Sequence, residues 1–150
     1  MKVAITCQNP DFNYDFECAD NGIIAVYGIS GSGKSSLLNA LAGFNSTISG
    51  VIEFNGKPIM DSSTCPAKVI KCSYMQQHPV LFPHWTIAQN LQFAEKYCAK
   101  KHDLADLLQQ LDCQQLVDKF PHELSGGEKQ RIAFIRALIQ IEDNSMVLLD

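Results

Sequence analysis

The chain lacks the features that would place it in a membrane, on a nucleic acid or outside the cell. Its 150 residues contain 12 Lys and Arg against 16 Asp and Glu, a net charge of -4 at pH 7. This leaves no basic footprint for DNA or RNA, so direct nucleic-acid binding is not expected. No segment approaches the roughly 18 to 20 apolar residues that cross a bilayer, and the first residues lack the apolar run of a secretory signal. We therefore expect a soluble, cytoplasmic protein.

Cysteine and histidine are present, but not in the patterns of disulfide scaffolds or metal sites. The six cysteines include no C-x-x-C pair, and the four histidines have no metal-ligand spacing. In a reducing compartment such cysteines are small buried side chains or free thiols. There is no internal repeat or low-complexity segment, and 150 residues correspond to about one domain of chain.

The first third of the sequence predicts strands, then a helix. Apolar residues alternate with polar ones over 3–7 and 12–18, which indicates an antiparallel hairpin of half-buried strands. The continuous apolar run 23–27 is typical of a strand buried on both faces of a parallel sheet. A helix is expected over 34–42, with Leu37, Leu38 and Leu41 facing inward. Gly43 would end this helix.

Residues 51–54 predict a strand that enters a type I′ turn at Asn55-Gly56. The Asp, Ser, Thr and Pro content of 61–68 indicates a loop. The apolar segment 146–149 predicts another buried strand, which ends at Asp150.

The middle of the chain is helical in pattern. Thr86-x-x-Gln89 is a capping box that starts one helix. Asp103 caps a second helix, whose apolar face carries leucines over 104–111. The segment 132–139 is apolar on nearly all sides, so its helix should be buried.

A phosphate-binding pattern, G-x-x-x-x-G-K-[ST], is present as Gly28-Ile29-Ser30-Gly31-Ser32-Gly33-Lys34-Ser35. It lies between an apolar run and a predicted helix, which is the context that the pattern requires. The glycines would let backbone N–H groups surround phosphates, Lys34 would reach the β- and γ-phosphates, and Ser35 would coordinate Mg²⁺. The alternative is a glycine-rich turn with a solvated lysine.

A second glycine-containing motif reads Leu124-Ser125-Gly126-Gly127-Glu128-Lys129-Gln130-Arg131. Ser125-x-x-Glu128 alone is explained as a capping box. That explanation leaves the two adjacent glycines unaccounted for. They would expose backbone N–H groups at the positive end of a helix, which is a site for an anion.

With these motifs the sequence resembles the ATP-binding cassette (ABC) family. The loop 28–35 is similar to its Walker A motif, 124–131 to its signature and Asp150 to its Walker B aspartate. Gln77 is similar to the Q-loop glutamine, with Gln76 as the neighbouring alternative. An aspartate that ends a strand is, taken alone, more often a turn or helix cap, and the upstream phosphate loop reverses that order for Asp150.

The resemblance implies ATP and Mg²⁺ as cofactors. It assigns catalytic roles to Lys34, Gln77 and Asp150, and metal coordination to Ser35, Gln77 and Asp150. The nucleotide-binding residues that it implies are Gly28, Ile29, Ser30, Gly31, Ser32, Gly33, Lys34, Ser35 and Ser36, together with Ser125, Gly126 and Gly127.

The fold that the resemblance implies is α/β, a P-loop NTPase core with a mostly parallel sheet, an N-terminal antiparallel β subdomain and a helical subdomain. The core would comprise 1–80 and 125–150, and the helical subdomain 81–124. Because the sequence stops at Asp150, the C-terminal part of such a domain is expected to be missing, including the glutamate that serves as general base. We therefore expect the 150 residues alone not to hydrolyse ATP.

In this family two subunits pair head to tail, so the resemblance implies a homodimer with ATP between one subunit's loop and the other's signature. It also implies docking of a membrane permease on Gln77–Trp85, which would place the protein at the inner face of the membrane. For Phe82 and Trp85, packing at the edge of the helical subdomain is an equal alternative. The family's adenine-stacking aromatic has no clear counterpart; Phe12 is the nearest candidate, although Phe12 and Tyr14 are better explained as core strand residues.

The residues at 21–23, 28–33 and 81–84 resemble those of the molybdate-type importer ATPases. This resemblance favours the hypothesis that the chain is the ATPase subunit of an importer. Two alternatives remain open. One is a soluble cassette ATPase of DNA repair or translation, and the other is a non-catalytic nucleotide-binding half-domain.

Overall fold

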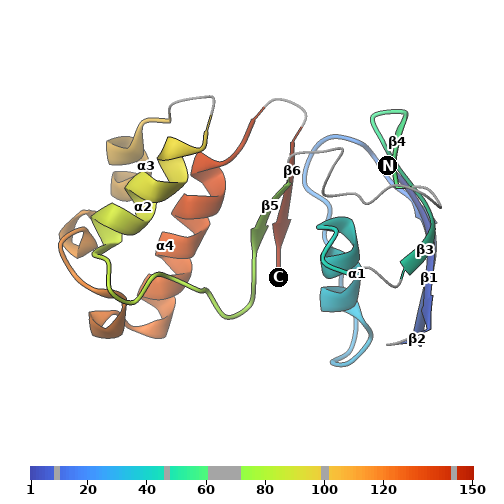
Figure 1. Ribbon diagram of the computed structural model, residues 1–150, viewed down its shortest axis with the longest axis horizontal. Coiled ribbons are helices and arrows are strands. Elements are labelled where there is room, and N and C mark those ends of the chain that lie inside the picture. Colours follow the sequence, from blue (N-terminus) through green and yellow to red (C-terminus); the bar gives the residue numbers. More distant parts are fainter. Residues whose placement is uncertain (9–10, 46–47, 61–71, 99–101, 143–144) are drawn as a thin grey trace. The chain divides into compact units, whose positions relative to one another are not determined.

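The computed structural model of the chain consists of two compact units (Figure 1). The first contains residues 1–72 together with Asp150, and the second contains residues 73–149. The described residues are 1–8, 11–45, 48–60, 72–98, 102–142 and 145–150. The loop expected over 61–68 lies outside them. The division into a core (1–80 and 125–150) and a helical subdomain (81–124) stays a prediction.

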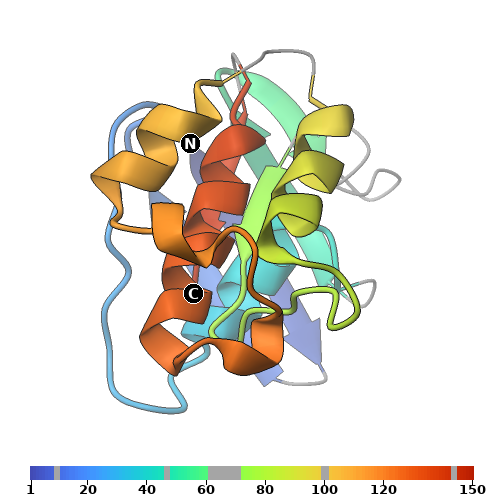
Figure 2. The ribbon, with the colours of Figure 1, turned by 90° about the vertical axis from the view of Figure 1, so that its left-hand side faces the viewer.

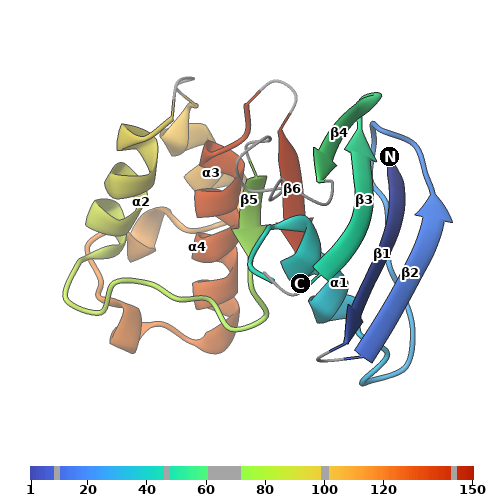
Figure 3. The ribbon, with the colours of Figure 1, turned by 45° about the vertical axis from the view of Figure 1, so that its right-hand side comes forward.

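The first unit is built on a four-stranded antiparallel sheet of order β2-β1-β3-β4 (Figure 3). Its strands are β1 (Lys2–Gln8), β2 (Asp11–Glu17), β3 (Ile48–Phe54) and β4 (Lys57–Met60). Alternate residues Val3, Ile5 and Cys7 of β1 are buried, so one face of the sheet forms the core. The predicted N-terminal hairpin is confirmed.

Two glycines of this sheet have positive φ for different reasons. Asn55 and Gly56 have φ of 51° and 68°, which confirms the type I′ turn between β3 and β4. Gly50 has φ of 126° and pairs with Ile5 on β1. A Cβ at Gly50 would collide with the carbonyl oxygen of Ala4, so the close approach of the two strands requires glycine.

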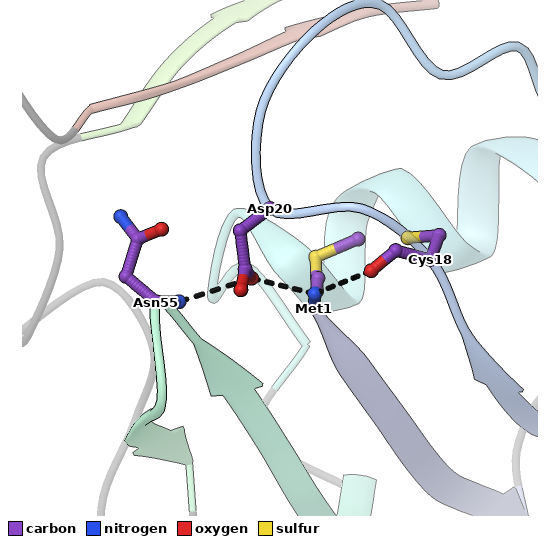
Figure 4. Close-up of polar contacts among 4 residues, drawn as sticks. All are labelled: Met1, Cys18, Asp20 and Asn55. Atoms are coloured by element: carbon purple, nitrogen blue, oxygen red, sulfur yellow. Dashed lines mark hydrogen bonds and ion pairs between the residues drawn. The ribbon is translucent and has the colours of Figure 1, made fainter.

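The N-terminal ammonium joins the start of β1 to the segment after β2 (Figure 4). It donates to the carbonyl oxygen of Cys18 at 2.6 Å and forms an ion pair with Asp20. Asp20 also accepts from the backbone N–H of Asn55 at 3.0 Å. The bond from the ammonium, followed by the bond from Asn55, lowers the pKa of Asp20 from its ordinary value.

Helix α1 (Lys34–Leu41) lies along one face of this sheet (Figures 1 and 3). It buries Leu37 and Leu41 as predicted, but Leu38 is only half-buried. Gly43, with φ of 75°, follows the C-cap. Its N–H bonds to the carbonyl of Ala40 at 3.0 Å, and the next N–H bonds back to the last turn of the helix, so the predicted glycine stop is confirmed.

The segment 23–27, predicted as a strand buried on both faces, is not a strand in the structure. None of the described strands pairs with it. Its side chains are solvent-exposed, with Ile23 102% and Tyr27 95% exposed. The prediction is wrong because an apolar run reports only the tendency to be buried. A strand also needs a neighbour to which its backbone can bond.

The second unit combines a two-stranded parallel sheet with helices. Strand β5 (Cys72–Met75), which starts at the boundary of the unit, runs beside β6 (Met146–Leu149) in the same direction (Figure 1). The helices are α2 (Ile87–Lys96), α3 (Leu104–Gln110) and α4 (Gly126–Ile139), with short 3₁₀ turns η2 (Gln114–Leu116) and η3 (Pro121–Glu123). The predicted helices are confirmed, and so is a strand before Asp150. Its predicted burial holds only in part, since Leu149 is 51% exposed.

Helix α4 is the centre of this unit and packs against both α2 and α3 (Figure 2). Its buried residues Ile132, Ile135 and Ile139 share one core with Leu91 and Leu116. The hydroxyl of Ser73 on β5 donates to a carbonyl near the end of α4, which fixes the sheet to the helix. No helix among the described residues combines the length and apolar character needed to span a membrane.

Candidate functional site

The phosphate-loop pattern forms an open turn in front of α1. Gly31 and Gly33 have φ of 81° and 89°, a conformation that disfavours side chains. Gly33 is the N-cap of α1, and no side chain caps the helix there. The helix N-terminus therefore presents uncapped backbone N–H groups, which can bind an anion.

The ammonium of Lys34 lies on this loop. Its Nζ donates to the carbonyl oxygens of Gly28 at 3.0 Å and Ile29 at 2.9 Å. These two bonds hold a positive charge at the mouth of the loop, beside the helix N-terminus. The loop and the lysine can thus attract the same anion.

Tyr14 contacts the loop from the sheet, which the sequence did not indicate. The side chain is half-buried on β2, as expected for a strand residue, and its hydroxyl lies 3.4 Å from the carbonyl oxygen of Ser32. A Cβ at Gly33 would collide with this hydroxyl. Phe12, the nearest candidate for an adenine-stacking residue, packs against Tyr14 with ring centroids 5.2 Å apart.

Ser35 and Asp150 come together although 115 positions separate them. The hydroxyl of Ser35 donates to Oδ1 of Asp150 at 2.8 Å, within the first unit. Hydroxyl and carboxylate oxygens are hard donors of the type that Mg²⁺ prefers, usually with phosphate oxygens completing the shell. The residues therefore fit the metal that the resemblance implies.

The signature sequence forms the start of α4, with Ser125 as its N-cap. The Ser125 hydroxyl accepts from the N–H of Glu128 at 3.3 Å, and Glu128 accepts from the backbone N–H of Ser125 at 2.7 Å. The predicted capping box is thus confirmed. Hydrogen bonds from the side chain and then the backbone of Ser125 lower the pKa of Glu128.

The capping box does not require the two glycines that follow Ser125. A Cβ at Gly126 or Gly127 would have nothing within 4 Å, and neither residue has positive φ. Both are exposed. Glycine is an unfavourable helix residue, so the fold of this chain gives no reason for either of them. They leave the backbone of the first helical turn open to a group that approaches from outside.

Gln77 lies in the bend after β5 and is exposed, as is Gln76, so exposure does not distinguish the two. Both belong to the second unit. The segment that follows is bonded to α4, since Nη1 of Arg136 donates to the carbonyl oxygen of Val80 at 2.7 Å. Burial lowers the pKa of the Arg136 guanidinium.

An aromatic cluster extends from this segment along α2. The Phe82 and Trp85 rings are 4.6 Å apart, and Phe93 packs against both at 5.2 and 5.3 Å. Tyr97 continues the row at 5.1 Å from Phe93. Phe82 remains 43% exposed and Tyr97 68% exposed. The sequence indicated Phe82 and Trp85 but neither Phe93 on α2 nor Tyr97 at its C-cap.

The glycine-rich loop, the lysine and the oxygen pair are together the features expected of a phosphate-binding α/β protein. The comparison with protein families narrows this class. A family model described as ABC transporter matches residues 12–150, so the chain belongs to the ABC transporter family.

Curated relatives are import proteins. The chain is 41% identical to a molybdenum import ATP-binding protein of Saccharophagus degradans, over 87% of this chain and 37% of that protein. It is 42% identical to an Fe(3+) ions import ATP-binding protein of Pectobacterium atrosepticum, over 77% and 35%. It is 32% identical to a thiamine import ATP-binding protein of Vibrio cholerae, over 99% and 63%. The chain thus spans between about one third and just under two thirds of the length of these relatives.

A solved structure supports the fold. The chain matches a structure titled as the ATP binding subunit of an ABC transporter, with a TM-score of 0.61 and 24% identity. The match covers 76% of this chain and 49% of that one. The α/β fold class expected from the sequence is therefore confirmed.

Proposed function

We propose that the chain is the nucleotide-binding part of an ATPase subunit that drives a membrane importer. The observation that carries the proposal is the Ser35–Asp150 contact beside the Lys34 loop, which joins a phosphate-binding loop to an oxygen pair fit for Mg²⁺. Names of relatives that act in molybdenum, iron and thiamine import support the transport role.

In this proposal the backbone of 28–36 and Lys34 bind the phosphates of ATP. The positive loop neutralises the charge that the phosphates carry and holds them in place. Ser35, Gln77 and Asp150 would hold Mg²⁺, which supplies charge neutralisation of the β- and γ-phosphates when bound. Gln77 and Asp150 also orient the groups around the γ-phosphate, so we assign catalytic roles to them and to Lys34.

The second half of the site is the start of α4. Ser125, Gly126 and Gly127 present a helix N-terminus with no Cβ over two successive residues, a surface suited to an anionic phosphate. We propose that it contacts ATP held by the loop of a second subunit, in a head-to-tail homodimer. The 150 residues then carry one half of each site, and we expect no turnover from this chain alone.

Transport requires contact with a permease, and we assign this contact to the segment Gln77–Trp85. Phe82 is exposed there next to a row of aromatic rings, and an apolar patch of this kind suits a protein interface. The permease would hold the protein at the inner face of the membrane. We propose an inorganic anion such as molybdate as cargo, on the basis of the relatives' names and the sequence resemblance.

The test uses the complete gene product that contains this chain. Equilibrium binding of a fluorescent ATP analogue and steady-state ATPase rates are measured for the wild type, Lys34→Ala and Asp150→Asn. Lys34→Ala should abolish nucleotide binding, and Asp150→Asn should retain binding but lower hydrolysis at least tenfold. Wild-type binding and turnover by Lys34→Ala would contradict the proposed site.

A further inference from the structure

Asn90 is a fully buried polar side chain on α2, with 0% exposure. Among the described residues, the buried polar side chains are Ser73 and Asn90. Burial of an amide is unfavourable unless its hydrogen bonds are satisfied. An apolar residue would fill the same position at less cost, so the amide itself needs an explanation.

The amide of Asn90 is satisfied by the loop in front of its own helix. Its Oδ1 accepts from the N–H of Phe82 at 2.8 Å, and its Nδ2 lies 3.2 Å from the carbonyl oxygen of the same residue. The same nitrogen contacts the carbonyl oxygens of Trp85 at 3.3 Å and Thr86 at 3.0 Å. One side chain therefore bonds to the first and the last residues of the segment 82–86.

Asparagine has the donor and acceptor arrangement that these partners demand. Phe82 needs an acceptor for its N–H. The two N–H groups of the amide face three carbonyl oxygens, of which those of Phe82 and Thr86 also accept from backbone N–H groups. Aspartate would keep the acceptor but lose the donor, and alanine would lose both. The loop also has a turn bond of its own, from the N–H of Trp85 to the carbonyl of Phe82 at 3.2 Å. The bonds of Asn90 attach this turn to helix α2.

The backbone atoms that Asn90 holds carry the two aromatic rings of the segment. The rings of Phe82 and Trp85 pack against each other and against Phe93 of α2. A change in backbone shape at either residue would therefore move the exposed part of the cluster. If the segment were held by side-chain packing alone, nothing would fix the backbone from which the two rings project.

We propose that Asn90 is a positioning residue that sets the conformation in which the segment 82–86 presents Phe82 and Trp85 to the permease. This inference rests on the docking role proposed for Gln77–Trp85. Asn90 touches neither ATP nor the metal-binding residues proposed above, so its loss should leave nucleotide binding by the subunit unchanged.

The experiment compares Asn90→Ala and Asn90→Asp with Gln92→Ala, an exposed position on the same helix. Trp85 is the one tryptophan of these 150 residues. Any others in the complete gene product are replaced by Phe, so that fluorescence reports on the segment. Three quantities are measured: acrylamide quenching of Trp85, binding of a fluorescent ATP analogue, and ATPase activity of the subunit assembled with its permease in proteoliposomes.

Both Asn90 variants should increase quenching of Trp85 at least twofold, change ATP-analogue binding by less than twofold and lower permease-coupled ATPase activity at least tenfold. Gln92→Ala should match the wild type in all three. Should Asn90→Ala fail to fold, Asn90→Asp, which keeps the size of the side chain, carries the comparison.

Unchanged Trp85 quenching in Asn90→Asp would overturn the positioning role. Altered quenching with full permease-coupled activity would instead overturn the docking role of the segment, and with it the functional part of the proposal. The two failures are therefore distinguishable.

Discussion

Replacing Gly127 with alanine should make the chain more stable and the ATPase less active. Gly127 is the second residue of α4, and its backbone is helical. A Cβ there would have nothing within 4 Å, so the substitution introduces no steric conflict in this chain. Alanine also loses less backbone entropy on folding than glycine does.

The two effects differ in size as well as in sign. A glycine-to-alanine change at a compatible position stabilises a protein by about 0.4–1 kcal/mol. The first turn is less constrained than a helix interior, so we take the lower end, about 0.5 kcal/mol. For a domain of 150–250 residues that unfolds as one unit, this corresponds to a rise in Tm of roughly 1–2 °C. A methyl group between the helix N-terminus and a phosphate should instead cost about a hundredfold in turnover, ~2.7 kcal/mol in the barrier.

Both quantities can be measured on the complete gene product. Thermal unfolding followed by circular dichroism gives Tm, and a coupled assay at saturating ATP gives the turnover number. Gly50→Ala is the matched control, because a Cβ at Gly50 collides with the backbone of β1 and should lower stability while leaving the signature intact. A lower Tm for Gly127→Ala, or turnover within twofold of the wild type, would refute the reasoning.

Three further predictions concern the stability of the fold. Gly50→Ala should destabilise the sheet by about 1–3 kcal/mol, seen as a lower urea midpoint, because both φ of 126° and the contact with Ala4 oppose a side chain; an unchanged midpoint would contradict it. Asp20 has a lowered pKa, so its contribution is present above the ordinary value of 3.8 and is lost as pH falls through the folded value. The wild-type urea midpoint should therefore fall more steeply below pH 4 than that of Asp20→Asn, and parallel acid profiles would count against this. Leu91→Ala, at a fully buried position, should cost about 2–5 kcal/mol in urea unfolding; less than 1 kcal/mol would mean that the helical core repacks.

Local signals in the sequence predicted the elements that depend on local chemistry. The capping boxes at Thr86 and Ser125, the Asn55-Gly56 turn and the glycine after α1 are all confirmed, because each is decided by neighbours within a few residues. The run 23–27 failed for the opposite reason. Its strand depended on a partner elsewhere in the chain, and periodicity carries no information on partners.

The interactions that sequence reasoning missed are those of single side chains with backbone groups outside their own helix or strand. The spacing of the buried residues of α2 places Asn90 on the buried face, but it does not reveal which backbone groups the amide would bond. The hydroxyl of Tyr14 reaches Ser32 only because β2 lies beside the loop in the folded unit. Contacts of this kind depend on where the backbone passes, which residue spacing does not reveal.

Ser125 and Gly127 show how structural and functional explanations of one motif can be separated. The capping box gives Ser125 and Glu128 a structural role, so a capping residue such as serine is expected here whether or not a ligand binds. It does not account for the glycines, which weaken the helix and relieve no contact within the chain. A residue that the fold does not need and that lowers stability is best explained by a group outside the chain. Aspartate at position 125 sharpens the distinction. It would still accept from the N–H of Glu128, but it would lose the bond that the serine hydroxyl donates to the Glu128 carboxylate at 2.6 Å, and it would repel a phosphate. Ser125→Asp should therefore lower Tm by only about 2–4 °C, a change worth ~1 kcal/mol, and abolish ATP turnover.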